Sequence, residues 1–292
     1  MLNFRPIELE DKALVESYYG RENHFLCDYC FTDLFIWGKH YNTEICEHNG
    51  FLYTKMNEDN CDYFFAPEGE GDIRPAMEEI FEYTRERDCP LILILIYPEM
   101  RKRIEAAYPD KFIFEENTGN MDYVYLAERL INLSGKKLHK EKNHFNHFIK
   151  EYEGRWSYED LNDENVKEFF TYQLDWCGED DEFLGELCAA SIALKNYKAL
   201  GIKGGILRVD GRIVAVTLGT QSFPDTYIIQ IEKADASING AYQAINKLFA
   251  ERNCQNVKYI DREEDMNIEG LRQAKESYYP KFLSMNYVAR LK

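Results

Sequence analysis

One order of predicted elements occurs twice along this chain of 292 residues, and this repetition constrains the fold more than any other feature. In the first half, residues 41–56 alternate between apolar and polar side chains around a turn at Asn49 and Gly50, which predicts a hairpin. A strand, a helix, a buried strand, a helix and two strands are then predicted at residues 62–66, 72–87, 90–96, 98–108, 111–116 and 122–128.

The second half repeats this order without repeating the sequence. Residues 204–222 predict a hairpin that turns at Asp210 and Gly211, one of the stronger short-range hairpin signals. A strand, a helix, a buried strand, a helix and terminal strand material are predicted at residues 225–235, 240–253, 256–261, 269–279 and 280–291. The chain is therefore expected to be an α/β protein with mixed sheets in two tandem units.

Net charge limits the classes of partner. The 35 Lys and Arg residues against 52 Asp and Glu residues give a formal charge of −17. Such a surface repels phosphate backbones, so a general DNA or RNA coat is excluded, although a local basic strip remains compatible with one phosphate-bearing partner. The longest strongly apolar run, residues 91–97, is far shorter than the roughly 20 residues that cross a bilayer. The N-terminus has no signal-peptide pattern, and we expect a cytoplasmic protein.

The eight cysteines suggest reduced, buried thiols rather than a disulfide framework. Only Cys27 and Cys30 form a C-x-x-C pair. A zinc site needs a second pair or two well-spaced histidines, and a redox pair needs a strand-to-helix context, whereas residues 25–37 resemble an aromatic-rich helix. No metal site is predicted.

A basic segment separates the halves. Residues 136–150 hold five lysines and three histidines against a single acid, Glu141. We predict an amphipathic linking helix at residues 136–152, an N-terminal domain at residues 1–134 and a C-terminal domain at residues 135–292. The polar side of this linking helix could bind phosphates of a tRNA acceptor end, of an anionic lipid headgroup or of a nucleotide. Alternatively, the helix could be a solvated linker whose lysines offset nearby acids. The candidate phosphate-binding residues are Lys136, Lys137, Lys140, Lys142, His144 and His147.

Four segments resemble a known family: YLAERLINLSGKKLHKEKNHFNHF, GGILRVDGRIVAVTLG, IEKADASINGAYQAINKLFA and DREEDMNIEGLRQAKESYYP. They are similar to the DUF2156 family, which resembles the C-terminal catalytic domain of phosphatidylglycerol lysyltransferase and, more distantly, the Fem-type aminoacyltransferases. The resemblance implies two tandem GNAT-like domains, that is, domains with the acyl-CoA N-acyltransferase-like fold. It also implies aminoacyl transfer from aminoacyl-tRNA.

Acyl transfer requires a general base and an acid for the leaving group. Glu232, near the end of the predicted strand at residues 225–235, is the candidate base, because the resembling fold separates its central strands there. The alternative is an ordinary ion pair at a strand end. Tyr278 and Tyr279 lie where GNAT enzymes often keep an acid tyrosine, and Tyr278 is the candidate acid. Aromatic core packing is the alternative.

Two further groups are candidates for substrate binding. Gly240 and Tyr242 begin a predicted helix where GNAT folds bind the pyrophosphate of coenzyme A, but the usual Q/R-x-x-G-x-G/A pattern is only partly met. A capped helix start is the alternative. Asp261, Arg262 and Glu263 follow a buried strand, where ligands gather in open sheets, and could hold a carboxylate or phosphate and an amino group. A solvated charged loop is the alternative.

These features predict an acyltransferase of the GNAT-like, aminoacyltransferase type. The preferred reaction is aminoacyl transfer from aminoacyl-tRNA to a small amine or hydroxyl acceptor, including a phospholipid headgroup such as phosphatidylglycerol. The alternatives are a coenzyme A-dependent N-acetyltransferase and a non-catalytic GNAT-fold binding module. No resident cofactor, no DNA partner and no transmembrane segment are predicted, and coenzyme A is the less favoured acyl donor.

Overall fold

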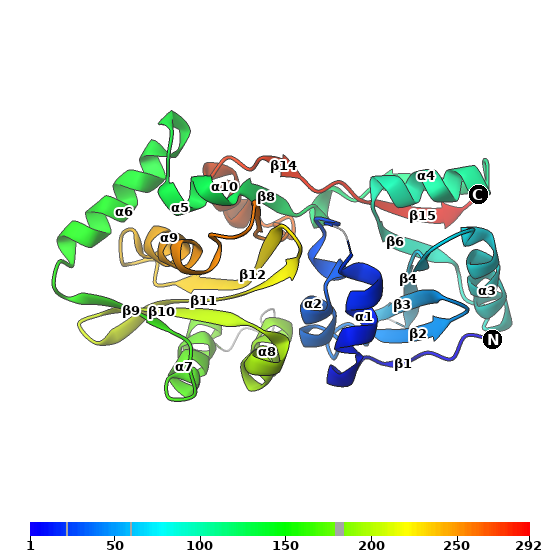
Figure 1. The fold of residues 1–292 in the computed structure, drawn as a ribbon, viewed down its shortest axis with the longest axis horizontal. Coiled ribbons are helices and arrows are strands. Elements are labelled where there is room, and N and C mark those ends of the chain that lie inside the picture. The colour runs from blue at the N-terminus through cyan, green and yellow to red at the C-terminus, as the bar shows by residue number, and fades with distance from the viewer. Residues whose placement is uncertain (22, 59, 179–183) are drawn as a thin grey trace. The chain divides into compact units, whose positions relative to one another are not determined.

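The computed structural model describes residues 1–21, 23–58, 60–178 and 184–292. The chain divides into two compact units. Unit 1 comprises residues 1–121 together with 284–292, and unit 2 comprises residues 122–283. Each unit contains one mixed sheet with helices packed against it (Figure 1). The predicted α/β class with mixed sheets is confirmed.

Unit 1 is built around a seven-strand path with the order β1-β2-β3-β4-β6-β15-β7, and β5 pairs beside it with β3. Its strands are β1 Arg5–Pro6, β2 Glu44–His48, β3 Phe51–Glu58, β4 Cys61–Phe65, β5 Glu68–Gly69, β6 Ile92–Ile96, β7 Phe112–Glu116 and β15 Tyr287–Leu291. Its α-helices are α1 Lys12–Tyr19, α2 Phe31–Ile36, α3 Ile73–Glu86 and α4 Pro98–Ala107.

Local sequence explains where these helices begin. The Asp72 side chain caps α3 by accepting a hydrogen bond from the backbone N–H of Arg74. The apolar face of α3, including Met77 and Ile80, is buried in a core that also contains Phe64. Pro98 begins α4, because its fixed φ suits the first helical turn.

Unit 2 repeats the same architecture with the strand order β9-β10-β11-β12-β13-β8-β14. Its strands are β8 Tyr123–Leu126, β9 Trp156–Asp160, β10 Lys203–Val209, β11 Arg212–Phe223, β12 Thr226–Ala234, β13 Tyr259–Asp261 and β14 Phe282–Leu283. Its α-helices are α5 Ala127–Asn132, α6 His139–Glu151, α7 Val166–Cys177, α8 Leu184–Leu200, α9 Ala241–Asn253 and α10 Glu269–Ser277. Helix α9 covers one face of the sheet, and α7 and α8 lie on the other (Figure 1).

The two sheets exchange one strand each. In both sheets a single parallel pair, β4 with β6 and β12 with β13, is followed by an antiparallel strand that comes from the other half of the chain. Strand β8 pairs with β13 and β14 in the second sheet, and β15 pairs with β6 and β7 in the first. The division between units therefore differs from the predicted boundary after residue 134: residues 122–134 belong to unit 2, and residues 284–292 belong to unit 1.

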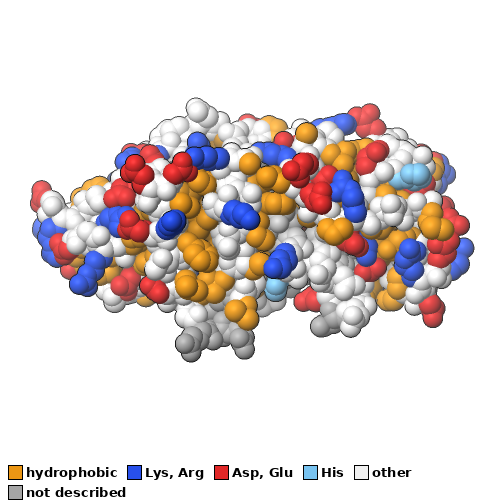
Figure 2. Space-filling view, turned by 90° about the horizontal axis from the view of Figure 1, so that it is seen from below, with side chains coloured by type: hydrophobic (Ala, Val, Ile, Leu, Met, Phe, Trp, Pro, Cys, Tyr) orange, Lys and Arg blue, Asp and Glu red, His pale blue; other side chains and the backbone are white. Residues whose placement is uncertain are grey.

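The part of the chain that the structure describes contains no helix that is long and apolar enough to cross a membrane. All eight cysteines are free thiols, and five of them, including Cys27 and Cys30, are buried. On the face of the molecule seen in Figure 2, basic and acidic side chains are interspersed rather than separated.

Candidate active site

The unit 2 sheet separates at its single parallel pair. Strands β12 and β13 are paired only from Thr226 with Tyr259 to Ile228 with Asp261, although β12 continues to Ala234. Immediately beyond this pairing, β12 carries a bulge in which Gln230 has no partner on β11. An extra residue reverses the alternation of side chains between the two faces of the sheet.

This bulge determines which face receives Glu232. Before it, Tyr227 and Ile229 pack with Phe249 of α9. After it, Lys233 points to the opposite face, where its Nζ lies 3.0 Å from Glu186 of α8. Glu232 therefore points toward α9, whereas an uninterrupted strand would have directed it toward α7 and α8.

Glu232 is held by two residues from different elements. Its Oε1 accepts a hydrogen bond of 2.7 Å from Nη2 of Arg262, which directly follows β13. Its Oε2 accepts one of 2.9 Å from Nδ2 of Asn246 on α9. The side chains of Arg262 and Glu232 are only 11% and 9% exposed. The predicted ion-pair alternative thus describes the contact of Glu232, but the pair crosses the point where the sheet opens rather than lying on an exposed strand end.

The guanidinium of Arg262 is enclosed by aromatic rings. Its Cζ lies 4.8 Å from the ring centre of Tyr278 and 5.8 Å from that of Tyr125. Burial lowers the pKa of Arg262, but the negative charge of Glu232 outweighs burial and raises it, so the group is a permanent cation. Its Nη1 is buried and has no hydrogen-bond partner among the described residues.

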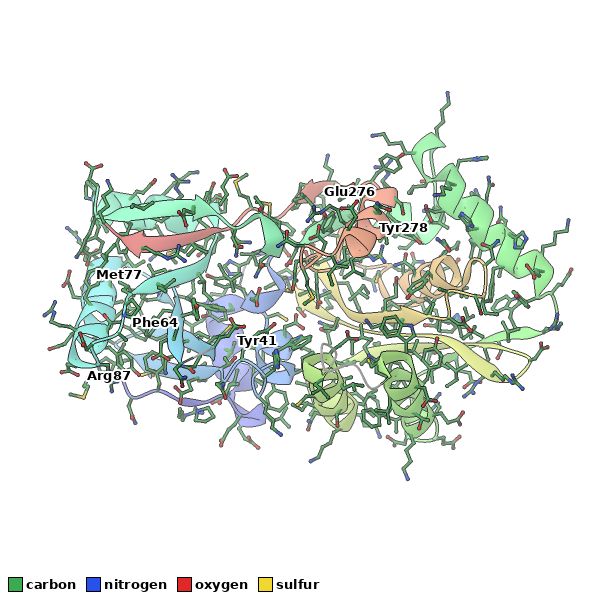
Figure 3. All side chains as sticks on the ribbon, turned by 180° about the vertical axis from the view of Figure 1, so that it is seen from behind. Tyr41, Phe64, Met77, Arg87, Glu276 and Tyr278 are labelled. Carbon is green, nitrogen blue, oxygen red and sulfur yellow. The ribbon has the colours of Figure 1, made fainter. Side chains whose placement is uncertain are left out.

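Tyr278 lies at the end of α10, where Figure 3 labels it. It is 5% exposed and belongs to the core that surrounds Phe249. Burial raises the pKa of its phenol, so the hydroxyl stays protonated at neutral pH. Tyr278 therefore combines core packing with direct contact to Arg262. Its neighbour Tyr279 is exposed instead, with Nζ of Lys137 5.1 Å from its ring centre.

A half-buried lysine, Lys275, holds the loop that carries Arg262. Nζ of Lys275 on α10 donates to three successive carbonyl oxygens, those of Arg262, Glu263 and Glu264. Burial lowers the pKa of Lys275. The backbone on either side of the Arg262 side chain is therefore held in place from α10.

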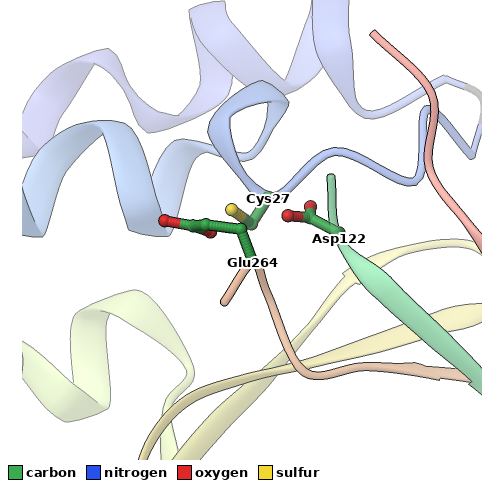
Figure 4. A group of neighbouring side chains, drawn as sticks. All are labelled: Cys27, Asp122 and Glu264. Atoms are coloured by element: carbon green, nitrogen blue, oxygen red, sulfur yellow. The ribbon is translucent and has the colours of Figure 1, made fainter. Parts of the chain in front are cut away.

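Asp261 is completely buried, and its Oδ1 accepts the backbone N–H of Glu263 at 2.9 Å. Burial raises the pKa of Asp261 to about 7. Asp122, which precedes β8, lies near the same loop, with a carboxylate oxygen within 4.8 Å of one from Glu264 (Figure 4). Asp261 thus contacts the backbone of its own loop, and the predicted grouping of Asp261 and Glu263 with Arg262 around one ligand stays a prediction.

Gly240 begins α9 and packs against α6. Its φ of +85° is left-handed, and a Cβ placed on it would lie 2.3 Å from the carbonyl oxygen of His144. On either side of this contact, Nδ1 of His144 bonds Oδ1 of Asn239 at 3.0 Å, and Gln243 donates to the buried Glu141 at 2.8 Å. The start of α9 is therefore covered by a helix at the position where GNAT folds bind pyrophosphate. Tyr242 packs against the core that α6 and α9 form with strands β10, β11 and β12.

The predicted basic residues lie on α6 and on the single helical turn that precedes it, at residues 136–138. Lys136, Lys137, Lys140 and Lys142 are exposed, and no ion pair involving them occurs within the described ranges. His147 contacts Glu151 at 3.1 Å. His144 is engaged with Asn239 and the exposed His147 with Glu151, so the four lysines are the exposed residues of the predicted strip that form no ion pair with a described residue.

Sequence reasoning missed Asn246 and Lys275. Asn246 lies on the inward face of α9, three residues before the buried Phe249, and this position is its only sequence signal. Lys275 occupies an ordinary last-turn position of α10, and nothing in the pattern indicates that it binds the loop of residues 262–264.

The comparisons with known proteins agree with this architecture. Residues 21–290 match the family model described as phosphatidylglycerol lysyltransferase, C-terminal. A conserved protein of unknown function from Bacteroides thetaiotaomicron is 34% identical, with a TM-score of 0.95 and full coverage of both chains. The structure of L-PGS from Bacillus licheniformis is 14% identical, with a TM-score of 0.70 over 98% of this chain and 92% of that one.

A tandem GNAT protein from the clavulanic acid biosynthesis pathway matches with a TM-score of 0.51 and 9% identity, covering 100% of this chain and 98% of that one. The structure of FemX matches with a TM-score of 0.59 and 9% identity, covering 98% of this chain and 97% of that one. These likenesses establish the tandem GNAT-like fold. An uncharacterized protein of Mycoplasmoides gallisepticum is 24% identical over 191 residues, which are 64% of this chain. The match spans 61% of the length of that protein. Because the family model covers most of its residues, the chain belongs to the family of phosphatidylglycerol lysyltransferase C-terminal domains.

Proposed function

We propose that this chain transfers an aminoacyl group from aminoacyl-tRNA to a small amine or hydroxyl acceptor, and that the headgroup of phosphatidylglycerol is the first acceptor to test. The observation that carries the proposal is the buried cluster of Glu232, Arg262 and Asn246 at the opening of the unit 2 sheet. The family of lysyltransferase domains supports the reaction class.

The proposed chemistry assigns roles to Arg262, Glu232 and Tyr278. The acceptor nitrogen or oxygen attacks the ester carbonyl, and Arg262 stabilises the negative charge that develops on the carbonyl oxygen. Glu232 takes the proton of the acceptor: each of its oxygens makes one hydrogen bond and retains a lone pair. The ester C–O bond then breaks, and the ribose oxygen that leaves receives a proton from Tyr278. Tyr278 regains this proton from Glu232 through water.

Coenzyme A is a poorer candidate for the acyl donor. Its pyrophosphate would require the backbone N–H groups at the start of α9. Gly240 is in contact with the His144 carbonyl there, and a carbonyl oxygen repels phosphate. The exposed lysines of α6 instead offer cations to a polyanionic donor such as tRNA.

The test is a transfer assay with tRNA charged with labelled amino acids and with vesicles that contain phosphatidylglycerol, and in parallel with soluble amines. We expect protein-dependent transfer of label, strongly reduced in Glu232→Gln and Arg262→Ala. Glu251→Gln is the matched control, because Glu251 is an exposed carboxylate on α9 that pairs only with Lys247 among the described residues. Full activity of both site variants would refute the assigned roles.

A second measurement separates the acyl donors. We expect tRNA binding that weakens with salt and is lost when Lys136, Lys137 and Lys140 are changed to Glu. Calorimetry with acetyl-CoA should show no binding. Binding of acetyl-CoA, together with indifference of tRNA binding to the three changes, would overturn the choice of donor.

A further inference from the structure

Two buried polar atoms of residues that contact Glu232 have no hydrogen-bond partner in the part of the chain that the structure describes. A carboxylate only accepts hydrogen bonds, so Asn246 must direct its Nδ2 toward Glu232, which leaves Oδ1 on the other side of the amide. This residue is 3% exposed, and its Oδ1 has no partner among the described residues. Arg262 likewise uses Nη2 for Glu232 and leaves Nη1 unpartnered.

One of these two atoms is a hydrogen-bond donor and the other an acceptor, and both belong to side chains that bind Glu232. Nη1 of Arg262 is a donor and Oδ1 of Asn246 is an acceptor, and both side chains are bound to the two oxygens of the same carboxylate. Native proteins leave few buried polar atoms unsatisfied, and such atoms call for a water or a ligand. A ligand that satisfied both would present an acceptor and a donor a few bonds apart.

The surrounding charge favours a cationic donor group. Two carboxylates, Glu232 and Glu141, and one guanidinium, Arg262, act on the ring of Tyr278. Glu141 is 2% exposed and is held by Gln243, one helical turn before Asn246. A second carboxylate besides Glu232 therefore acts on this part of unit 2, and an ammonium group is the kind of donor that carboxylates favour.

We propose that Arg262 and Asn246 form a subsite for an α-ammonium carbonyl unit, in which the carbonyl oxygen accepts from Nη1 of Arg262 and the ammonium donates to Oδ1 of Asn246. This inference rests on the proposed function, because an aminoacyl ester contains this unit and an acetyl thioester lacks the ammonium. Asn246 is then a specificity-determining residue that distinguishes aminoacyl from simple acyl groups.

The test uses amino acid amides, which keep the ammonium and the carbonyl but are not transferred readily. Each L-amino acid amide is compared by calorimetry with its N-acetylated counterpart, without tRNA. We expect at least one amide to bind and its N-acetylated form to bind about 10 to 100 times more weakly, the range for one hydrogen bond to a charged group. Equal binding of the two forms, or binding of no amide, would overturn the subsite.

Asn246→Leu should weaken the binding of that amide by a similar factor. Asn253→Leu is the matched control: Asn253 lies on the same helix and bonds the carbonyl of Phe249. Unchanged amide binding in folded Asn246→Leu contradicts the inference. If this variant fails to fold, the test rests on the unaltered protein, for which the binding of each amide is compared with that of its N-acetylated form.

The outcomes separate the subsite from the reaction. Amide binding that depends on Asn246, without any transfer from aminoacyl-tRNA, supports the subsite and overturns the proposed function. Transfer without a preference for the free ammonium overturns the subsite and leaves the function standing.

Discussion

Replacing Gly240 by Ala tests the packing of α6 on the start of α9. Two costs add in this variant. Alanine in a left-handed conformation costs about 1–2 kcal/mol. In addition, the new Cβ would lie 2.3 Å from the carbonyl oxygen of His144 and 3.0 Å from Cβ of Phe148, so α6 must move, at a typical overpacking cost of about 1–3 kcal/mol. We therefore expect unit 2 to lose about 2–5 kcal/mol.

Gly201→Ala provides the matched control. Its φ of +78° is close to the +85° of Gly240, but nothing lies within 4 Å of the position of its Cβ. Urea unfolding followed by the fluorescence of Trp156 and Trp176, both in unit 2, measures the two variants. Gly201→Ala should show only the conformational cost. Equal destabilisation by the two substitutions would refute the contact, and with it the structural reason for disfavouring coenzyme A.

Three further predictions follow from the contacts. In a double-mutant cycle, Glu232→Gln and Arg262→Met should each destabilise unit 2 by about 3–5 kcal/mol and the pair by much less than the sum, whereas additive effects would exclude a direct ion pair. Because burial raises the pKa of Asp261 to about 7, from about 3.9 when unfolded, the native state binds the extra proton between these values. Stability should then fall as pH rises from 4 to 7, by up to about 4 kcal/mol; Asp261→Asn should flatten this slope in urea titrations, and an unchanged slope would contradict the assignment. Truncation after residue 283 removes β15 from between β6 and β7, so amides of unit 1 should lose protection from hydrogen exchange, while retained protection would contradict the pairing.

The regular elements could be predicted because their signals are local. The turns at Asn49 and Gly50 and at Asp210 and Gly211 connect hairpins as expected, and the apolar periodicity located α3 and α9. Strand β9 and helices α7 and α8 escaped prediction, although they are the counterparts of β1, α1 and α2 in the same order. Both units therefore repeat more of their architecture than the sequence indicated.

The candidate site could be predicted only in part, because a residue's face depends on long-range pairing. Asp261 ends β13 and Arg262 directly follows it, so the direction of each side chain depends on how the chain leaves the sheet, which local sequence does not indicate. The direction of Glu232 depends on the bulge at Gln230, whose neighbours on β12 read as an ordinary apolar strand. Asn246 could not be predicted as a site residue, because its contact with Glu232 depends on how α9 packs against β12.

The strand exchange links the site to the whole chain. Arg262 lies just beyond β13, and β13 is flanked by β12 on one side and by β8 on the other. Strand β8 also carries Tyr125, which faces Arg262 and donates through its hydroxyl to the carbonyl of Lys275. Strand β8, from the first half of the sequence, thus supplies one wall of the site, whereas Glu232, Arg262 and Asn246 come from the second half.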